Sequence, residues 1–364
     1  ARDKMYSQLI YFIIALVLFS VQEPGPRPAF PPLPTVFLGG AFLFLFVWIC
    51  FQAFRTLEQR TELAEGFSIL AARFHNLQNR LCILALVFLA VQVYIFQIKS
   101  LLHQILGLQT FSSLTGTFGL ALYLLHLCII WFFGHPLYRR IFSSNLTRGT
   151  YIRARVTFYA ALLVPWVLIS LAFDLLMLLS LPPAFSSDLG QFVTMNALLV
   201  LFVLIAPWLI VRLWRCEPLP PGAVRTELEE FCRQYVFRVG GLMRWPMLGG
   251  ETLTAGVVGI LPRLRFILIT EGLLQVLGVE QLKAVIAHEM GHVRRFHLLI
   301  YLAFFIGFSA LLYCYHDLIL LLLLKSDTLL RLTLSPAAED LTYFSLAYSL
   351  PVLLLLVLYF RYLF

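Results

Sequence analysis

Long runs of apolar residues, separated by shorter polar segments, dominate the chain from one end to the other. A membrane-spanning helix needs about 20 such residues, and eight runs approach or exceed that length. They lie at Met5–Val21, Val36–Phe54, Leu81–Ile98, Leu114–Phe133, Val156–Leu179, Phe192–Val211, Leu298–Leu324 and Leu341–Phe360. We therefore predict an all-α membrane bundle of about eight transmembrane helices, six of them in residues 1–211 and two in residues 298–364.

Residues 212–297 break this pattern and predict a small α+β domain. In "AVRTELEEFCRQYVFRVG", apolar side chains recur every three or four residues, as in an amphipathic helix. "ETLTAGVVGI" and "RFILIT" are short and rich in β-branched residues, which favours two strands. Thr270 is a candidate cap for a short helix, "EGLLQVL", and a longer helix follows from about Glu280. The apolar positions expected on the first helix are Leu228, Phe231, Cys232, Tyr235, Val236 and Val239.

Composition agrees with a membrane protein. The chain has 364 residues, of which 60% are hydrophobic and only 13% are charged, and its mean hydropathy is +0.87. A soluble domain of this length would carry far more charge. The six cysteines are scattered and form no C-x-x-C pair, so the sequence indicates no disulfide framework.

The basic residues are distributed unevenly among the predicted loops. Of the 27 Lys and Arg residues, 23 fall in the two ends and the second, fourth and sixth loops, and 4 fall in the other loops. Short loops rich in Lys and Arg stay on the cytoplasmic side during insertion. We therefore expect both ends of the sequence and residues 212–297 to face the cytoplasm. The net charge of +8 is then explained by contact with anionic lipid, and we predict no nucleic-acid partner.

The stretch "AVIAHEMGHVRRFH" carries the chemistry, in the pattern His288-Glu289-x-x-His292. Residues four apart lie on one face of a helix, so both imidazoles can bind one zinc ion. Glu289 is then in reach of a water molecule beside the metal and is the candidate general base. Zinc acidifies such a water and polarises a carbonyl, which suits peptide hydrolysis. Continuing the helix places His297 about 140° away from His292, so we assign His297 to the membrane interface.

Three segments, "LTAGVVG", "RFILITEGLL" and "EQLKAVIAHEMGHVRRFH", together resemble the integral-membrane zinc metallopeptidases of the CAAX prenyl protease and HtpX type. The resemblance implies a gluzincin fold for residues 212–297. It also implies that the strand near Leu253–Gly259 binds an extended substrate at its edge. The substrate-binding residues would be Thr254, Ala255, Gly256 and Val257, with Thr254 standing where the family usually has Asn.

The same resemblance implies a third zinc ligand, a Glu on a helix beyond two further spans. Asp317 lies nearly twenty residues into the seventh predicted span, too far along that helix to reach the ion. Asp327, Glu339 and Asp340 fall in the last loop, which the charge distribution places across the membrane. We therefore predict that the third ligand lies beyond Phe364.

Together these features predict a membrane-embedded zinc metalloendopeptidase, with Glu289 as the catalytic residue and His288 and His292 as metal ligands. Its partners would be the lipid bilayer and peptide or membrane-protein substrates, lipidated ones among them. Two alternatives stay open: a membrane sensor that signals through a metallopeptidase domain, and a non-catalytic membrane scaffold. The sequence specifies no oligomeric state.

Overall fold

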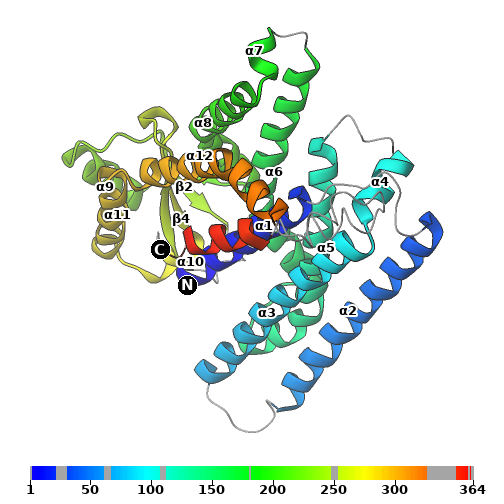
Figure 1. Ribbon diagram of the computed structural model, residues 1–364. Helices are drawn as coiled ribbons and strands as arrows, with labels where there is room; N and C mark the ends of the chain where they lie inside the picture. Colours follow the sequence, from blue (N-terminus) through cyan, green and yellow to red (C-terminus); the bar gives the residue numbers. More distant parts are fainter. Residues whose placement is uncertain are drawn as a thin grey trace. The chain divides into compact units, whose positions relative to one another are not determined.

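The computed structural model describes residues 2–21, 31–60, 67–106, 112–179, 182–246, 253–325, 350–359 and 361. The chain divides into two compact units, of which one comprises Ala1–Ile152 with Ala310–Phe364 and the other Arg153–Ser309. Two long helices, α6 (Arg148–Leu178) and α12 (His297–Leu324), each begin in one unit and end in the other (Figure 1).

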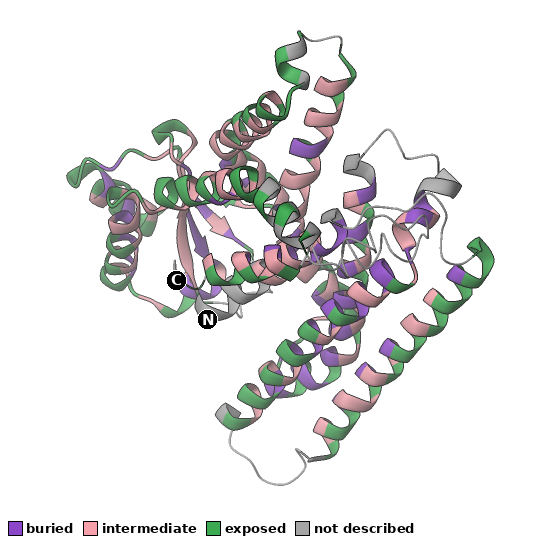
Figure 2. Ribbon diagram, viewed as in Figure 1, coloured by how far each residue is buried: buried purple, intermediate pink, exposed green. Residues whose placement is uncertain are grey.

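Helices α1 to α5 make up most of the described part of the first unit. Helices α3 and α5 pack along each other, and α1 and α2 contact both of them (Figure 1). Buried residues follow the length of α3 and α5 (Figure 2), and Phe46, Phe74 and Tyr123 are among the largest fully buried side chains. The bounds are Arg2–Val21 (α1), Pro32–Arg60 (α2), Phe67–Ala90 (α3), Ile98–Leu106 (α4) and Ser112–Ile141 (α5), with a π-helix at Val91–Ile95 after α3.

A buried histidine lies inside α5 without interrupting it. His126 Nδ1 is 2.8 Å from the carbonyl oxygen of Leu122, one turn earlier, and the Phe46 ring packs edge-on against the imidazole. This local bond occupies one ring nitrogen without a partner from another helix. The apolar run of α5 therefore continues through His126 as one helix.

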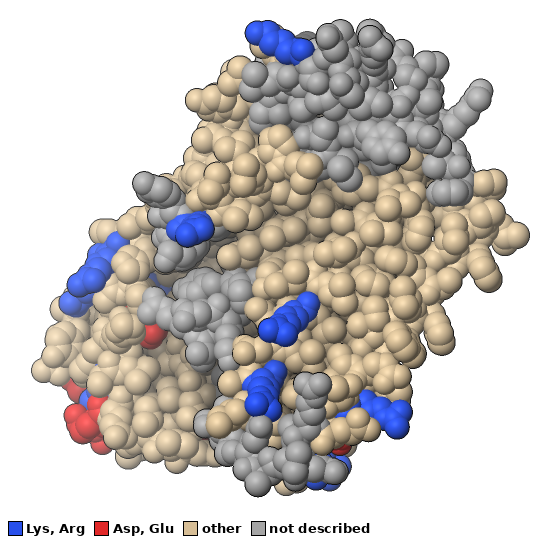
Figure 3. Space-filling view, turned by 60° about the horizontal axis from the view of Figure 1, so that its bottom comes forward, with Lys and Arg blue, Asp and Glu red and all other residues tan. Residues whose placement is uncertain are grey.

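The predicted membrane spans are confirmed in part. Five helices in the described ranges are long and apolar enough to cross a bilayer, and a bent sixth, Arg148–Ala161 with Leu163–Leu178, is a further candidate. The expected count of eight is not confirmed. Among the described residues, Ile10–Phe19 and Leu350–Tyr359 are apolar helices shorter than a full span. Charged side chains are sparse on the face shown in Figure 3. The five spans indicate a multi-pass membrane protein; they are Pro32–Gln59, Ile69–Ile95, Thr115–Ile141, Asp188–Leu213 and His297–Tyr315.

The helices of the second unit carry identifiable sequence signals. In α6, the 42° bend lies between Ala161 and Leu163, and Pro165 explains it because a proline ring clashes with the carbonyl four residues earlier. Ser187 caps α8 (Asp188–Leu213) by accepting a hydrogen bond from the amide of Gly190. Asn196 on α8 donates to the Ser309 hydroxyl on α12 at 3.2 Å. The short helix α7 spans Pro183–Ser186.

A four-stranded sheet follows α8, with the strand order β1-β2-β4-β3. The two predicted strands are present, as β3 (Ala255–Val258) and β4 (Phe266–Thr270), and they pair antiparallel. Two further strands were not predicted: β1 (Glu217–Pro218) and β2 (Gly241–Trp245), the latter parallel to β4. The segment "GLMRW" shows little strand character because Arg244 interrupts its apolar residues. Arg244 pairs with Glu217 and Glu271.

The two faces of the sheet are covered differently. On one face, Leu242, Ile267 and Ile269 pack against α9 (Ala223–Gln234) and α11 (Val279–Arg294). The other face presents Met243, Trp245 and Leu268 to residues of α6 and α8. There, the Phe158, Trp214 and Trp245 rings stack at centroid distances of 5.6 and 4.4 Å. This stack joins the sheet to α6 and to the residue that ends α8.

Helix α9 ends earlier than its sequence pattern predicts. Leu228 and Cys232 are buried against the sheet as expected, but Tyr235 and Val236 are exposed. Val236 has a positive φ of 52°, so the backbone leaves the helix and the apolar repeat no longer lies on one face. The predicted positions beyond Gln234 are therefore wrong for the helix. Phe237 returns to the core one residue later.

Candidate metal centre

Helix α11 carries the predicted motif and is held firmly in the fold. Leu282, Ile286 and Met290 are buried at spacings of four and pack against the sheet. Gly278 is the N-cap of the helix, and its backbone amide donates a hydrogen bond to the Gln281 side-chain oxygen at 3.1 Å. Because the buried stripe uses one face, the other face of α11 is left to polar residues. His288 and His292 lie away from the buried stripe, near the C-terminal end of the helix, and Glu289, seven residues after Leu282, borders it.

The motif side chains come together as the spacing predicts. His288 is exposed, Glu289 and His292 are partly buried, and one ligand atom from each lies within 4.8 Å of the others. The rings of His288 and His292 stand nearly perpendicular, with centroids 4.9 Å apart. An added Cβ at Gly291 would meet no atom within 4 Å, so the space beside the cluster is open on that side.

The donor atoms fit a zinc ion. His288 Nε2 and His292 Nε2 lie 3.2 Å apart. A tetrahedral zinc holds two nitrogen ligands about 2.0–2.1 Å from the metal, and hence about 3.3 Å from each other. The two imidazoles are therefore already spaced as a shared zinc requires, and imidazole nitrogens suit this metal.

The His297 side chain contacts His292, whereas the sequence predicted that it points away from the motif. Its Nδ1 is 2.8 Å from the Nδ1 of His292, on the side of that ring opposite His288. The 140° projection fails because α11 ends at Arg294 and α12 begins at His297, with Phe296 between them at a φ of 56°. The chain turns at this point and brings the two rings together. The sequence signal that could have indicated a role for His297 is the presence of a third histidine close to the motif.

The predicted substrate-binding segment forms the edge strand β3, at one end of the sheet order. Thr254 precedes it, and both its backbone groups bond to Thr270: its amide donates to the Thr270 hydroxyl and its carbonyl accepts from the Thr270 amide. Backbone groups alternate in direction along an antiparallel strand. Gly256 therefore faces β4 like Thr254, while Ala255 and Val257 present their N–H and C=O groups to the open edge. Helix α11 packs directly against β3.

Residues 247–350 match the family model of Peptidase family M48. The match includes β3, β4 and the whole of α11 and α12. It indicates a metallopeptidase. A search of curated proteins finds no match to the chain.

Among the described residues of the matched segment, the structure brings no acidic side chain other than Glu289 into the cluster. Among the described residues, the group that brings three or more ligand atoms this close consists of His288, Glu289 and His292. Asp327, Glu339 and Asp340 lie outside the described residues, and so does any residue beyond Phe364. The predicted third ligand thus stays a prediction.

Two cysteines, Cys216 and Cys232, lie in the second unit outside the five apolar spans. Burial raises the pKa of the Cys216 thiol to about 12. Burial and, to a lesser extent, the charge of Glu229 raise the pKa of Cys232 to about 11. Zinc binds the thiolate form of cysteine, and both thiols keep their protons at neutral pH. Neither thiol belongs to the group of close ligand atoms formed by His288, Glu289 and His292.

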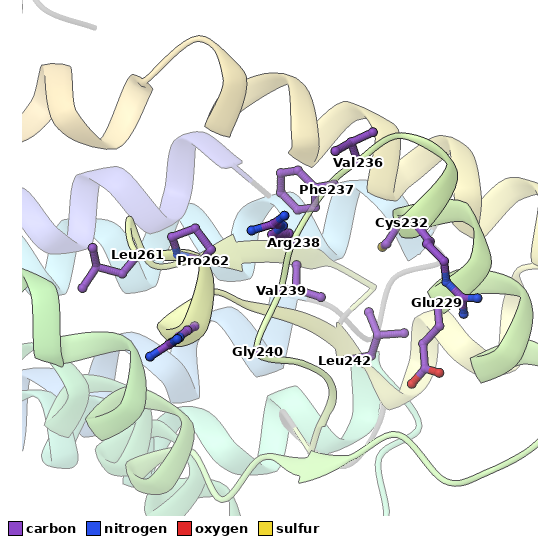
Figure 4. Close-up of a pocket in the computed structure, with 12 residues that line it drawn as sticks. Glu229, Cys232, Val236, Phe237, Arg238, Val239, Gly240, Leu242, Leu261 and Pro262 are labelled. Carbon is purple, nitrogen blue, oxygen red and sulfur yellow. The ribbon is translucent and has the colours of Figure 1, made fainter.

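A hollow of about 920 Å³ lies beside the sheet, at the end where β2 and β4 begin (Figure 4). Its walls come from the C-terminal part of α9, the following loop and the turn at Pro262–Leu264. They combine apolar side chains such as Val236 and Leu261 with three arginines. None of the three motif residues lines this hollow. The pair of imidazoles lies outside it, so we place the candidate active centre of the matched segment at the histidine cluster.

Proposed function

We propose that this protein is a membrane-embedded zinc metalloendopeptidase that hydrolyses peptide bonds of membrane-associated or lipidated substrates. The observation that carries the proposal is the paired imidazole geometry, with 3.2 Å between His288 Nε2 and His292 Nε2, inside a segment matching a metallopeptidase family. The resemblance to CAAX prenyl proteases and HtpX-type enzymes supports the choice of substrates. The charge distribution supports a cytoplasmic site.

In this proposal His288 and His292 would hold the zinc ion. The ion would supply Lewis-acid polarisation of the scissile carbonyl and lower the pKa of water at the site. Glu289 takes a proton from the attacking water as the water oxygen forms a bond with the carbonyl carbon. It then gives that proton to the amide nitrogen as the C–N bond breaks, so one carboxylate acts first as base and then as acid.

The substrate would bind as an added strand on β3. An extended peptide can pair with the outward N–H and C=O groups of Ala255 and Val257, and main-chain pairing of this kind needs no particular side chain. Thr254 and Gly256 would support this edge from behind through β4. Since α11 packs against β3, a strand bound there lies along the helix that carries the motif.

Replacing Val257 by proline is expected to lower kcat/KM roughly fivefold, because it removes one outward N–H and with it a hydrogen bond of about 1 kcal/mol. Proline is tolerated on edge strands. Val257→Ala keeps the N–H and serves as the control for the lost side-chain packing. Hydrolysis of a mixture of quenched-fluorescence peptides measures the difference. If the alanine and proline variants lose the same activity, the edge does not bind substrate backbone.

The proposal as a whole is tested by metal removal. The full chain, purified in detergent, is expected to hold about one zinc per molecule, as a catalytic site of this type does. Dialysis against a chelator should stop peptide hydrolysis, and added zinc should restore it. A preparation that folds but holds no stoichiometric zinc would instead identify the chain as a non-catalytic scaffold.

A further inference from the structure

We propose that His297 is a positioning residue for the metal centre: it accepts a hydrogen bond from His292 and thereby fixes the orientation and tautomer of that ligand. This inference rests on the proposed zinc site. It concerns a residue that is no part of the His-Glu-x-x-His pattern and reaches the site through a turn in the backbone.

The contact itself is direct. His292 Nδ1 and His297 Nδ1 are 2.8 Å apart, within ordinary hydrogen-bond distance. The ring centroids are 4.8 Å apart and the planes are inclined by 59°. Both side chains are partly buried, so water competes less for this bond than it would on an open surface. The pair therefore constrains the His292 ring about both of its side-chain torsions.

The two nitrogens of His292 then have separate tasks. Nε2 faces His288 Nε2 at 3.2 Å and is the atom placed to bind the metal. A metal-binding nitrogen must be unprotonated, so the single proton of the neutral ring lies on Nδ1. That N–H points at His297 Nδ1, which must therefore be the acceptor. A histidine ligand usually donates its second ring N–H in this way, and the partner sets the ring orientation and raises the basicity of the ligand.

The backbone between the two residues is built for this contact. Arg295 closes α11, with its amide bonded to the Gly291 carbonyl at 3.0 Å. Phe296 then takes a positive φ of 56° and is largely exposed, and α12 starts at His297. Arg294 donates to the Tyr235 carbonyl at 2.7 Å, which ties the end of α11 to the loop after α9. A strained residue held between two fixed helices keeps His297 against His292.

The test is zinc affinity, measured by competition with a chromophoric chelator on the purified full chain. His297→Ala is expected to bind zinc about 10- to 100-fold more weakly than the unchanged protein. His297→Gln offers an amide oxygen as acceptor and should recover most of this loss. Leu298→Ala, an exposed position in the same turn, is the control for disturbance of the helix junction and should bind zinc normally.

Cobalt substitution separates positioning from ligation. The visible absorption of the Co²⁺-loaded protein reports the ligand number and geometry, and it should keep the same bands in His297→Gln. A spectrum that loses a nitrogen ligand in both His297 variants would make His297 a metal ligand and overturn the positioning role. Equal zinc affinity in His297→Ala and the unchanged protein would also overturn it. If the unchanged protein binds no zinc, the proposed function itself fails.

Discussion

Glutamine in place of Glu289 is expected to abolish peptide hydrolysis while leaving zinc bound. Glutamine has nearly the shape of glutamate but cannot take a proton from water at neutral pH. General base catalysis contributes about 10²- to 10⁴-fold, and the same carboxylate also returns the proton to the leaving nitrogen, so we expect a loss of at least about 1000-fold in kcat. Glu289 is one position round the helix from His288 and lies within 4.8 Å of both imidazole donors.

Glu280→Gln is the matched control for this change. Glu280 is an exposed carboxylate in the first turn of the same helix, so its replacement alters the charge of α11 equally but far from the motif. Its ion pair with Lys283 is at the surface and contributes little to stability. Activity and zinc content should both stay near normal. Full hydrolysis by the Glu289→Gln variant would exclude Glu289 as the general base.

Much of the fold follows from local sequence patterns, and the exceptions have physical causes. Helices such as α2, α8 and α12 are predicted because their apolar runs exceed the bilayer thickness. Strand β2 is missed because its pairing with β4 is between segments over twenty residues apart, and "GLMRW" alone has a weak strand pattern. The end of α9 is missed because a valine at positive φ is uncommon and no glycine marks it.

The metal site divides in the same way. His288, Glu289 and His292 are within one turn of a single helix, so helical geometry alone brings them together. His297 depends on the break after α11, where Phe296 adopts a left-handed backbone at a cost of roughly 1 kcal/mol. Neither glycine nor proline marks that break in the sequence. A straight helix is therefore the simplest expectation from the sequence, and it wrongly places the His297 side chain away from His292.

Alanine in place of His288 is expected to lower the zinc content of the protein as well as its activity, because it removes a metal ligand. Protein zinc sites bind with about 10–16 kcal/mol, shared among three or four ligands, so one ligand contributes about 3 kcal/mol or more, which corresponds to at least about 100-fold in affinity. His288 is exposed, so the substitution creates no cavity and the fold should be retained. Ala284→Ser, one turn earlier on the same helix and also exposed, is the control.

The comparison of His288→Ala with Glu289→Gln separates metal binding from proton transfer at adjacent positions. Zinc content by elemental analysis should fall only in the alanine variant, whereas hydrolysis should be lost in both. Added zinc in large excess should restore part of the activity of His288→Ala, because His292 and the remaining ligands still bind the ion weakly. It should restore none in Glu289→Gln, which lacks the base and not the metal. Zinc bound as tightly by His288→Ala as by the unchanged protein would remove His288 from the ligand set.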